Sequence, residues 1–186
     1  GCCQVLDRLA AREGLAYDAG GALAQQGNLV PAYAPQWDAL PYHALPYPKS
    51  LDNGWVRDAL WPLVNDRSLA TADALHTFAT WLAGKIAADL RQVGTSRSSG
   101  EGAEAGAKKG TKSKVLITGG GAHNDFLLHQ LRTAAPHLDV VTLNADVTDF
   151  KEAALIALGA LLRVNGIPNA LASATGAARD TVNGAL

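Results

Sequence analysis

The sequence contains few sulfur-bearing residues, so they indicate neither a functional site nor a cellular compartment. Its 186 residues include no methionine and only two cysteines, which are adjacent at Cys2 and Cys3. Adjacent cysteines provide no disulfide framework, and no Cys/His spacing around them matches a zinc site. We therefore expect no structural metal, and we expect the two cysteines to be buried residues at the start of a helix rather than nucleophiles.

Long apolar runs and an excess of charge are also missing. No stretch approaches the length needed to span a bilayer, and the first residues lack the regions of a signal peptide. The formal net charge is −1, so nothing in the bulk charge favours nucleic acid or an anionic membrane. We predict a cytoplasmic protein whose ligand is recognised by a local site. Because the chain opens on glycine without methionine, we expect it to be a piece of a longer protein.

The chain contains enough apolar residues to form a hydrophobic core, since 48% of its residues are hydrophobic. The periodicity predicts a short helix over 3–13, ended by Gly14, and a long core helix over 71–92. Glycines and prolines in 17–56 predict mostly loop, with a short helix near 30–40. Lys49 lies in this part, and we expect it to be solvated.

The C-terminal third alternates between strands and helices. We predict strands at 115–118 and 139–143, and helices at 125–134 and 150–164, the last with a buried apolar face. Before it, 94–114 is low in complexity and predicts a disordered surface insertion. The resulting division is a helical, loop-rich part at 1–93, the insertion at 94–114, and an α/β nucleotide-binding part at 115–186.

A strand followed by Gly119, Gly120 and Gly121 is the main candidate site. Glycines have no Cβ and accept positive φ, so a ligand can lie directly against the backbone there. The same pattern also builds an ordinary turn, and the spacing alone leaves both interpretations open. It fits neither the dinucleotide fingerprint nor a P-loop. Asn124 is expected to cap the next helix, and His123 is either an exposed loop residue or a ligand contact.

Two carboxylates near the start of the last helix also have two interpretations. Asp149 and Glu152 have the spacing of a capping box, in which Asp149 caps and Glu152 reaches back. Alternatively, Glu152 faces the mouth of the sheet, where it orients a hydroxyl or a water. The residues themselves do not decide between these roles.

Five motifs in order along the chain resemble the C-terminal half of the anhydro-N-acetylmuramic acid kinases, sugar kinases of the actin/hexokinase-like superfamily. The motifs are Leu15-Ala16-Tyr17-Asp18 with Gly27 downstream, Leu45-Pro46-Tyr47-Pro48-Lys49-Ser50-Leu51, Ile117-Thr118-Gly119-Gly120-Gly121-Ala122-His123-Asn124, Asp149-Phe150-Lys151-Glu152-Ala153, and Thr175-Gly176-Ala177. The similarity covers nearly the whole chain apart from the insertion. It implies an α/β, ribonuclease H-like kinase lobe that is part of a two-domain fold.

The resemblance also implies an activity and a site. Such kinases open the intramolecular bond of 1,6-anhydro-N-acetylmuramic acid with water and phosphorylate the 6-hydroxyl, in the recycling of cell-wall amino sugars. By this similarity Gly119, Gly120, Gly121, His123 and Asn124 line the ATP side, with Mg²⁺ accompanying the phosphates. Glu152 is the catalytic candidate, near the sugar and the attacking water. The resemblance suggests a homodimer, and the bulk charge predicts no nucleic acid or membrane partner.

The sequence departs from the family pattern at its beginning. The family's general base is an aspartate just before the helix that corresponds to 3–14, and the chain starts after that position. Cys3 stands where family members usually carry asparagine. We therefore expect these residues alone to bind nucleotide weakly and to lack kinase activity. The alternatives are a non-catalytic nucleotide- or sugar-binding remnant of the fold, and a generic Rossmann-like domain that binds NAD.

Overall fold

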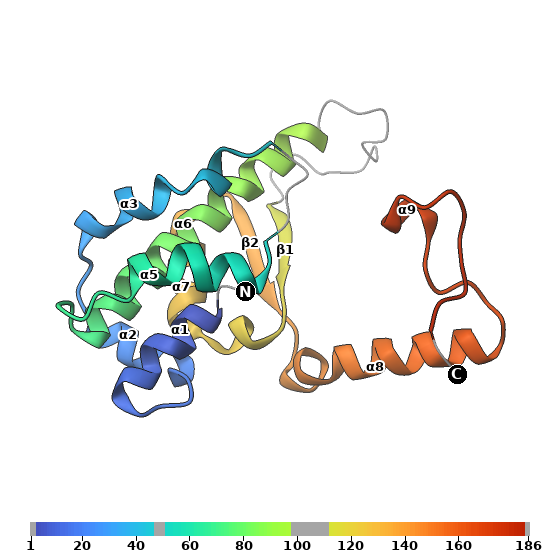
Figure 1. Ribbon diagram of the computed structural model, residues 1–186, viewed down its shortest axis with the longest axis horizontal. Helices are drawn as coiled ribbons and strands as arrows, with labels where there is room; N and C mark the ends of the chain where they lie inside the picture. Colours follow the sequence, from blue (N-terminus) through green and yellow to red (C-terminus); the bar gives the residue numbers. More distant parts are fainter. Residues whose placement is uncertain (1–2, 47–50, 98–111, 185–186) are drawn as a thin grey trace. The chain divides into compact units, whose positions relative to one another are not determined.

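The computed structural model describes residues 3–46, 51–97 and 112–184 (Figure 1). Lys49 and most of the predicted insertion lie outside these residues. The chain forms two compact units, Gly1–Thr142 and Leu143–Leu186, and each is described by itself. The division at 1–93, 94–114 and 115–186 stays a prediction.

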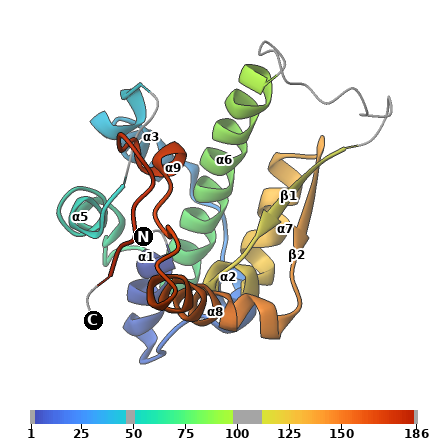
Figure 2. The same ribbon diagram turned by 90° about the vertical axis from the view of Figure 1, so that its right-hand side faces the viewer.

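Helices make up most of the first unit, and two short strands complete it. Its elements are α1 (Cys3–Ala10), α2 (Ala22–Gln26), α3 (Ala34–Asp38), α4 (Asn53–Trp55), α5 (Trp61–Val64), α6 (Thr71–Arg97), β1 (Ser113–Ile117), α7 (Asp125–Ala134) and β2 (Leu138–Thr142). The strands are parallel, with Ser113 opposite Leu138 and Ile117 opposite Thr142. Helix α7 packs against both α6 and β2 (Figure 2). The chain is therefore α/β, as predicted.

Helix α6 is the centre of the core. Its Leu75, Phe78 and Ala79 are fully buried, as its three- and four-residue spacing predicts. The helix runs five residues beyond the predicted end at 92, to Arg97, and so enters the segment 94–114 that was predicted as an insertion. Trp37 of α3 is 1% exposed and packs edge-on against Phe78, with ring centroids 5.8 Å apart. The predicted short helix near 30–40 thus exists and contributes to the core.

The predicted first helix is also confirmed. Helix α1 continues as a tight 3-10 turn over Ala11–Glu13, and Gly14 ends it with a φ of 74°. Val5, Leu6 and Leu9 form its buried face. Its first residue departs from expectation, because Cys3 is exposed and not buried. Cys2 lies outside the described residues.

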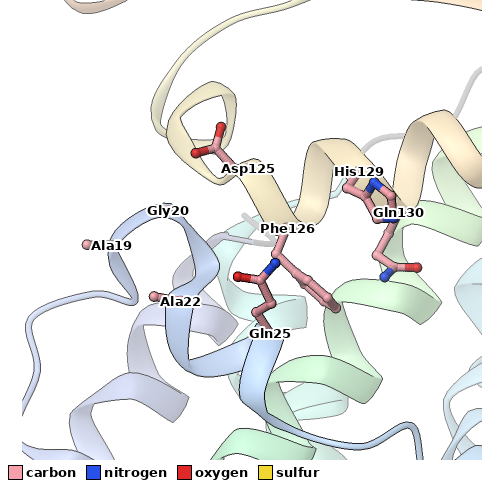
Figure 3. A pocket seen from close by; sticks show the side chains of 8 residues that line it. All are labelled: Ala19, Gly20, Ala22, Gln25, Asp125, Phe126, His129 and Gln130. Atoms are coloured by element: carbon pink, nitrogen blue, oxygen red, sulfur yellow. The ribbon is translucent and has the colours of Figure 1, made fainter.

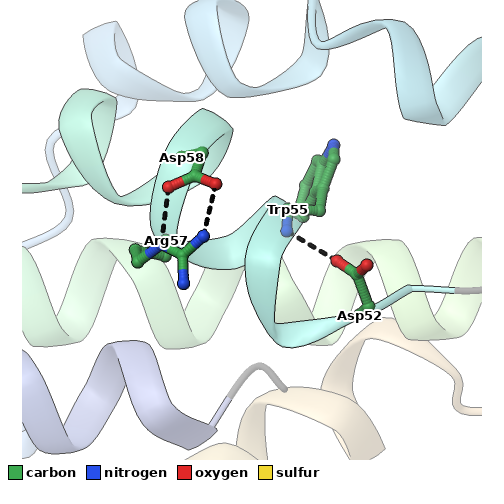
Figure 4. A network of polar contacts seen from close by, with 4 residues as sticks. All are labelled: Asp52, Trp55, Arg57 and Asp58. Carbon is green, nitrogen blue, oxygen red and sulfur yellow. Dashed lines mark hydrogen bonds and ion pairs between the residues drawn. The ribbon is translucent and has the colours of Figure 1, made fainter.

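The helical stretch that begins with α4 contains two local polar contacts (Figure 4). Asp52 caps α4 by accepting a hydrogen bond from the Trp55 N–H at 2.7 Å. One turn of π-helix follows over Val56–Leu60, and within it Arg57 forms an ion pair with Asp58 at 2.6 Å. Both charged side chains are exposed, so this pair contributes little to stability.

The second unit contains α8 (Ala145–Val164) and α9 (Ala172–Thr175). Helix α8 begins at Ala145 and not near residue 150, because Asn144 caps it by accepting from the Val147 N–H at 2.9 Å. The capping box predicted for Asp149 and Glu152 is therefore wrong. Both residues lie in the second turn, where every backbone N–H already has a helical acceptor.

Within the second unit taken by itself, the face predicted to be buried over 150–164 is not covered. Phe150 is 66% exposed and Leu161 59% exposed, and Leu158 is exposed as well. Among its described residues, the second unit contains the long helix α8, the short helix α9 and an isolated β-bridge between Ala170 and Thr181, which form no second layer over the apolar face of α8. Within the described ranges, no helix is long and apolar enough to cross a membrane.

A pair of glycines allows the packing of α2 against α6 to be tested. A Cβ on Gly27 would overlap the backbone carbonyl of Ala72, whereas a Cβ on Gly84, inside α6, would meet nothing within 4 Å. We expect Gly27→Ala to reduce the free energy of unfolding by about 1–3 kcal/mol through overpacking. Gly84→Ala should raise it by about 0.5–1 kcal/mol through helix propensity. Urea denaturation of both variants measures this, and equal effects of the two substitutions would contradict the packing.

Candidate functional site

The glycine loop connects β1 to α7 and has a backbone that only glycine adopts readily. Gly119 has a φ of 76° and a ψ of −173°. A 3-10 turn follows over Gly120–His123, held by hydrogen bonds from Ala122 N–H to Gly119 O at 2.9 Å and from Asn124 N–H to Gly121 O at 3.3 Å. The loop therefore has a defined conformation.

Three backbone donors in this loop remain available. Among the described residues, none accepts a hydrogen bond from the N–H groups of Gly119, Gly120 or Gly121. Nothing lies within 4 Å of the place where a Cβ of Gly119 or Gly120 would stand. Successive unengaged backbone N–H groups are the kind of donor set that binds anions such as phosphates.

Asn124 performs the predicted capping role. Its side-chain oxygen accepts a hydrogen bond from Leu127 N–H at 2.8 Å, so α7 begins at Asp125. Leu127, Leu128 and Leu131 are buried and fix the helix in the core. The end of the glycine loop is thus anchored to a rigid element, while His123, the residue before Asn124, is exposed.

The start of α1 lies beside this loop. A Cβ placed on Gly121 would stand 3.3 Å from the Cys3 sulfur, so the glycine allows the two segments to approach closely. Desolvation by the surrounding protein and the nearby Asp7 carboxylate both raise the pKa of the Cys3 thiol. A thiol that resists ionisation is a poor nucleophile. Cys3 therefore lies beside the loop, and its raised pKa disfavours the thiolate form.

A second loop, which the sequence pattern did not identify as part of the site, lies close to the capped start of α7. Gly21 has a φ of 75°, and a Cβ there would stand 2.5 Å from both the Asn124 side-chain oxygen and the Cβ of Phe126. The buried Asp18 carboxylate holds this loop by accepting hydrogen bonds from the N–H groups of Leu23 at 2.8 Å and Ala24 at 2.9 Å. The sequence signal for this loop is the spacing of Asp18 and Gly21. The sequence analysis interpreted the glycines of this region only as residues that interrupt helices.

Glu152 lies on α8 in the second unit, so the structure gives no distance from it to the glycine loop. Its side chain is 80% exposed and lies 3.6 Å from the Lys151 ammonium. The carboxylate is therefore accessible to a ligand. The structure brings together Cys3, Gly121 and Asn124, and it leaves the role of Glu152 as a prediction.

The residues present fit a phosphate chain better than a resident metal. Within 3–46, 51–97 and 112–184, no group of three or more His, Cys, Asp or Glu side chains is arranged to hold a metal ion. A magnesium ion at this loop would therefore be held mainly by the phosphates it accompanies. The backbone donors of the glycine loop suit the phosphates themselves.

Comparison with known proteins gives one consistent family. The model of the family described as anhydro-N-acetylmuramic acid kinase matches residues 3–186. Curated proteins with that name are similar to this chain. The one from Ruegeria sp. is 34% identical over 172 residues, with 91% of this chain and 41% of the relative covered. The one from Synechococcus elongatus is 31% identical, with 88% of this chain and 41% of the relative covered. The chain spans about two fifths of the length of these relatives.

Proposed function

Since the match over residues 3–186 means that this chain belongs to the anhydro-N-acetylmuramic acid kinase family, we propose that it forms one part of an ATP-dependent sugar kinase. The enzyme would convert 1,6-anhydro-N-acetylmuramic acid, water and ATP into N-acetylmuramic acid 6-phosphate and ADP. We propose an actin/hexokinase-like lobe for its fold, and the cytoplasm for its location. The homodimer implied by the resemblance belongs to the same proposal.

The observation that carries the proposal is the set of unengaged N–H donors at Gly119, Gly120 and Gly121. Phosphoryl transfer depends on positioning and on stabilising charge that develops on the phosphate oxygens. Backbone donors fixed between β1 and the capped start of α7 can supply both without moving. In this proposal they bind the phosphates of ATP, and Mg²⁺ supplies further neutralisation of charge when it is bound with them.

The proposed role of Glu152 is to position water at the sugar. In the reaction, water adds to the anomeric carbon, the anhydro C–O bond breaks, and the released 6-oxygen takes the γ-phosphoryl group while ADP leaves. The proton lost by water must go to a base. A carboxylate that accepts a hydrogen bond from the water orients it and favours its attack. The exposed side chain of Glu152 is free to meet such a substrate.

The Gly120→Val variant tests whether the loop binds nucleotide. A Cβ at Gly120 meets nothing within 4 Å and its φ is not positive, so the side chain should fit without strain in the free protein. We expect unchanged thermal stability, but at least about a tenfold increase in the ATP dissociation constant, because the new side chain occupies the approach to the backbone. NMR titration with ATP measures this.

The matched control is Gly84→Val, which adds the same side chain to another open glycine, on α6. This variant should bind ATP like the unmodified chain. If Gly120→Val also binds ATP with unchanged affinity, the glycine loop is not the nucleotide site.

A further inference from the structure

The turn before α2 lies against the capped end of the glycine loop. Figure 3 shows Gly20 of this turn on one side of a pocket, and Asp125 and Phe126 of α7 on the other. Gly20 and Gly21 have positive φ values of 63° and 75°, which residues with a Cβ rarely adopt. Gly21 leaves no room for a Cβ beside Asn124. The contact with α7 therefore depends on the turn keeping this conformation.

Asp18 holds the turn in this conformation. The residue is 7% exposed, and its two carboxylate oxygens accept hydrogen bonds from the N–H groups of Leu23 at 2.8 Å and Ala24 at 2.9 Å, at the start of α2. Its backbone carbonyl oxygen accepts from the Gly21 N–H at 3.1 Å. Hydrogen bonds to a buried carboxylate are stronger than those between neutral groups. Asp18 therefore fixes both the turn and the first residues of α2.

Helix α2 is in turn attached to α6, the centre of the core. His76 of α6 forms a hydrogen bond through Nδ1 with Ala24 O at 3.0 Å, and its ring centroid lies 4.7 Å from that of Phe126. Just after α2, the Asn28 N–H donates to the Asp73 carboxylate of α6 at 2.6 Å. Since these contacts hold α2 in place, the conformation of the preceding turn is what Asp18 controls.

Asn124 connects this turn to the glycine loop. Its side chain caps α7, and its backbone N–H donates to Gly121 O at 3.3 Å, which closes the 3-10 turn of the loop. We propose that Asp18 is a positioning residue for the phosphate-binding loop. Through the turn and Asn124, it keeps Gly119–Gly121 in the conformation that leaves their N–H groups available. The inference rests on the proposed function and adds to it a residue more than one hundred positions from the loop, which touches no substrate itself.

The Asp18→Asn variant tests this role, because the amide keeps the shape of the carboxylate but has one acceptor oxygen for two backbone donors. In the free chain, we expect amide hydrogen exchange at Ala122 and Asn124 to become at least about tenfold faster, since local opening of the loop becomes easier. Exchange at Phe78, in the core of α6, should change less than at the loop. We also expect the ATP dissociation constant to rise at least about fivefold. NMR measures both quantities.

The matched control is Asp66→Asn, the same change at a carboxylate that accepts hydrogen bonds from the Tyr33 hydroxyl at 2.7 Å and the Ser68 N–H at 2.8 Å. This variant loses hydrogen bonds in the same unit, in the segment before α6. It should leave both the exchange of the glycine loop and the affinity for ATP unchanged. If Asp18→Asn does not fold, Gly20→Ala strains the same turn through its positive φ and should speed exchange at Asn124.

Three results would overturn the positioning role. Unchanged exchange at Asn124 in Asp18→Asn means that the turn does not hold the loop, whatever the chain binds. Equal acceleration at Asn124 and Phe78 means that Asp18 serves only general stability. If Asp18→Asn binds ATP normally while Gly120→Val does not, the role of Asp18 is rejected and the proposed function stands. If the unmodified chain does not bind ATP, the proposed function fails first, and the role of Asp18 fails with it.

Discussion

Under the proposed function, replacing Glu152 with glutamine in a complete enzyme that includes this chain is expected to lower kcat by about 100- to 10,000-fold, the usual contribution of a positioned acid or base. The amide has nearly the same shape as the carboxylate, but it carries no charge and does not draw a proton from water. Because the Glu152 side chain is 80% exposed and its nearest charged partner is Lys151 at 3.6 Å, the fold should not depend on it. A coupled assay of ADP release with the anhydro sugar measures kcat and KM separately.

The control for this variant is Asp146→Asn, which makes the same carboxylate-to-amide change in the first turn of α8. Asp146 is exposed and belongs to the same helix, so any general effect on α8 appears in both variants. The Asp146 variant should retain its turnover and its thermal stability. If the Glu152→Gln variant has an unchanged kcat, Glu152 has no catalytic role, and no residue of α8 is then assigned one.

The elements that the sequence predicted best are those whose local signals agree. Helix α7 starts at a strong cap, Asn124, and continues with buried leucines, so its predicted and observed bounds coincide at 125–134. Helix α6 keeps its apolar spacing along the core, and only its end was placed too early. Where capping, periodicity and burial point to the same residues, local sequence is sufficient.

The start of α8 was missed because two caps compete within a few residues. Asp149 and Glu152 match a capping box, but Asn144 caps first, and nothing between Ala145 and Thr148 breaks a helix. The burial of α8 was missed for another reason. Periodicity identifies an apolar face, but whether another layer covers it depends on tertiary structure that a local pattern does not contain.

The candidate site was predicted in part. The glycine loop and the capping role of Asn124 follow from residue types alone. The approach of Cys3 to Gly121, and of Gly21 to Asn124, joins segments more than one hundred residues apart in the chain. Such contacts depend on the packing of α1 and α2 around α6 and α7, so they were not available from local spacing.

Trp37→Ala is expected to cause the largest loss of stability, because Trp37 is the largest fully buried side chain of the core. Its ring contacts those of Tyr33, Phe78 and Trp81, at centroid distances of 6.1, 5.8 and 5.4 Å. Truncation of a buried tryptophan removes these contacts and leaves a cavity. The expected loss is about 3–5 kcal/mol in the free energy of unfolding. Urea denaturation followed by circular dichroism measures it.

A graded variant keeps this experiment informative if the alanine variant does not fold. Trp37→Phe retains an aromatic ring but loses the hydrogen bond from the indole N–H to Leu63 O, which spans 3.4 Å. It should therefore lose less stability than Trp37→Ala. Leu15→Ala is the control, since Leu15 is 44% exposed and its truncation should change stability by less than about 0.5 kcal/mol. If Trp37→Ala costs no more than Leu15→Ala, α3 does not pack on α6, and the first unit has a different core.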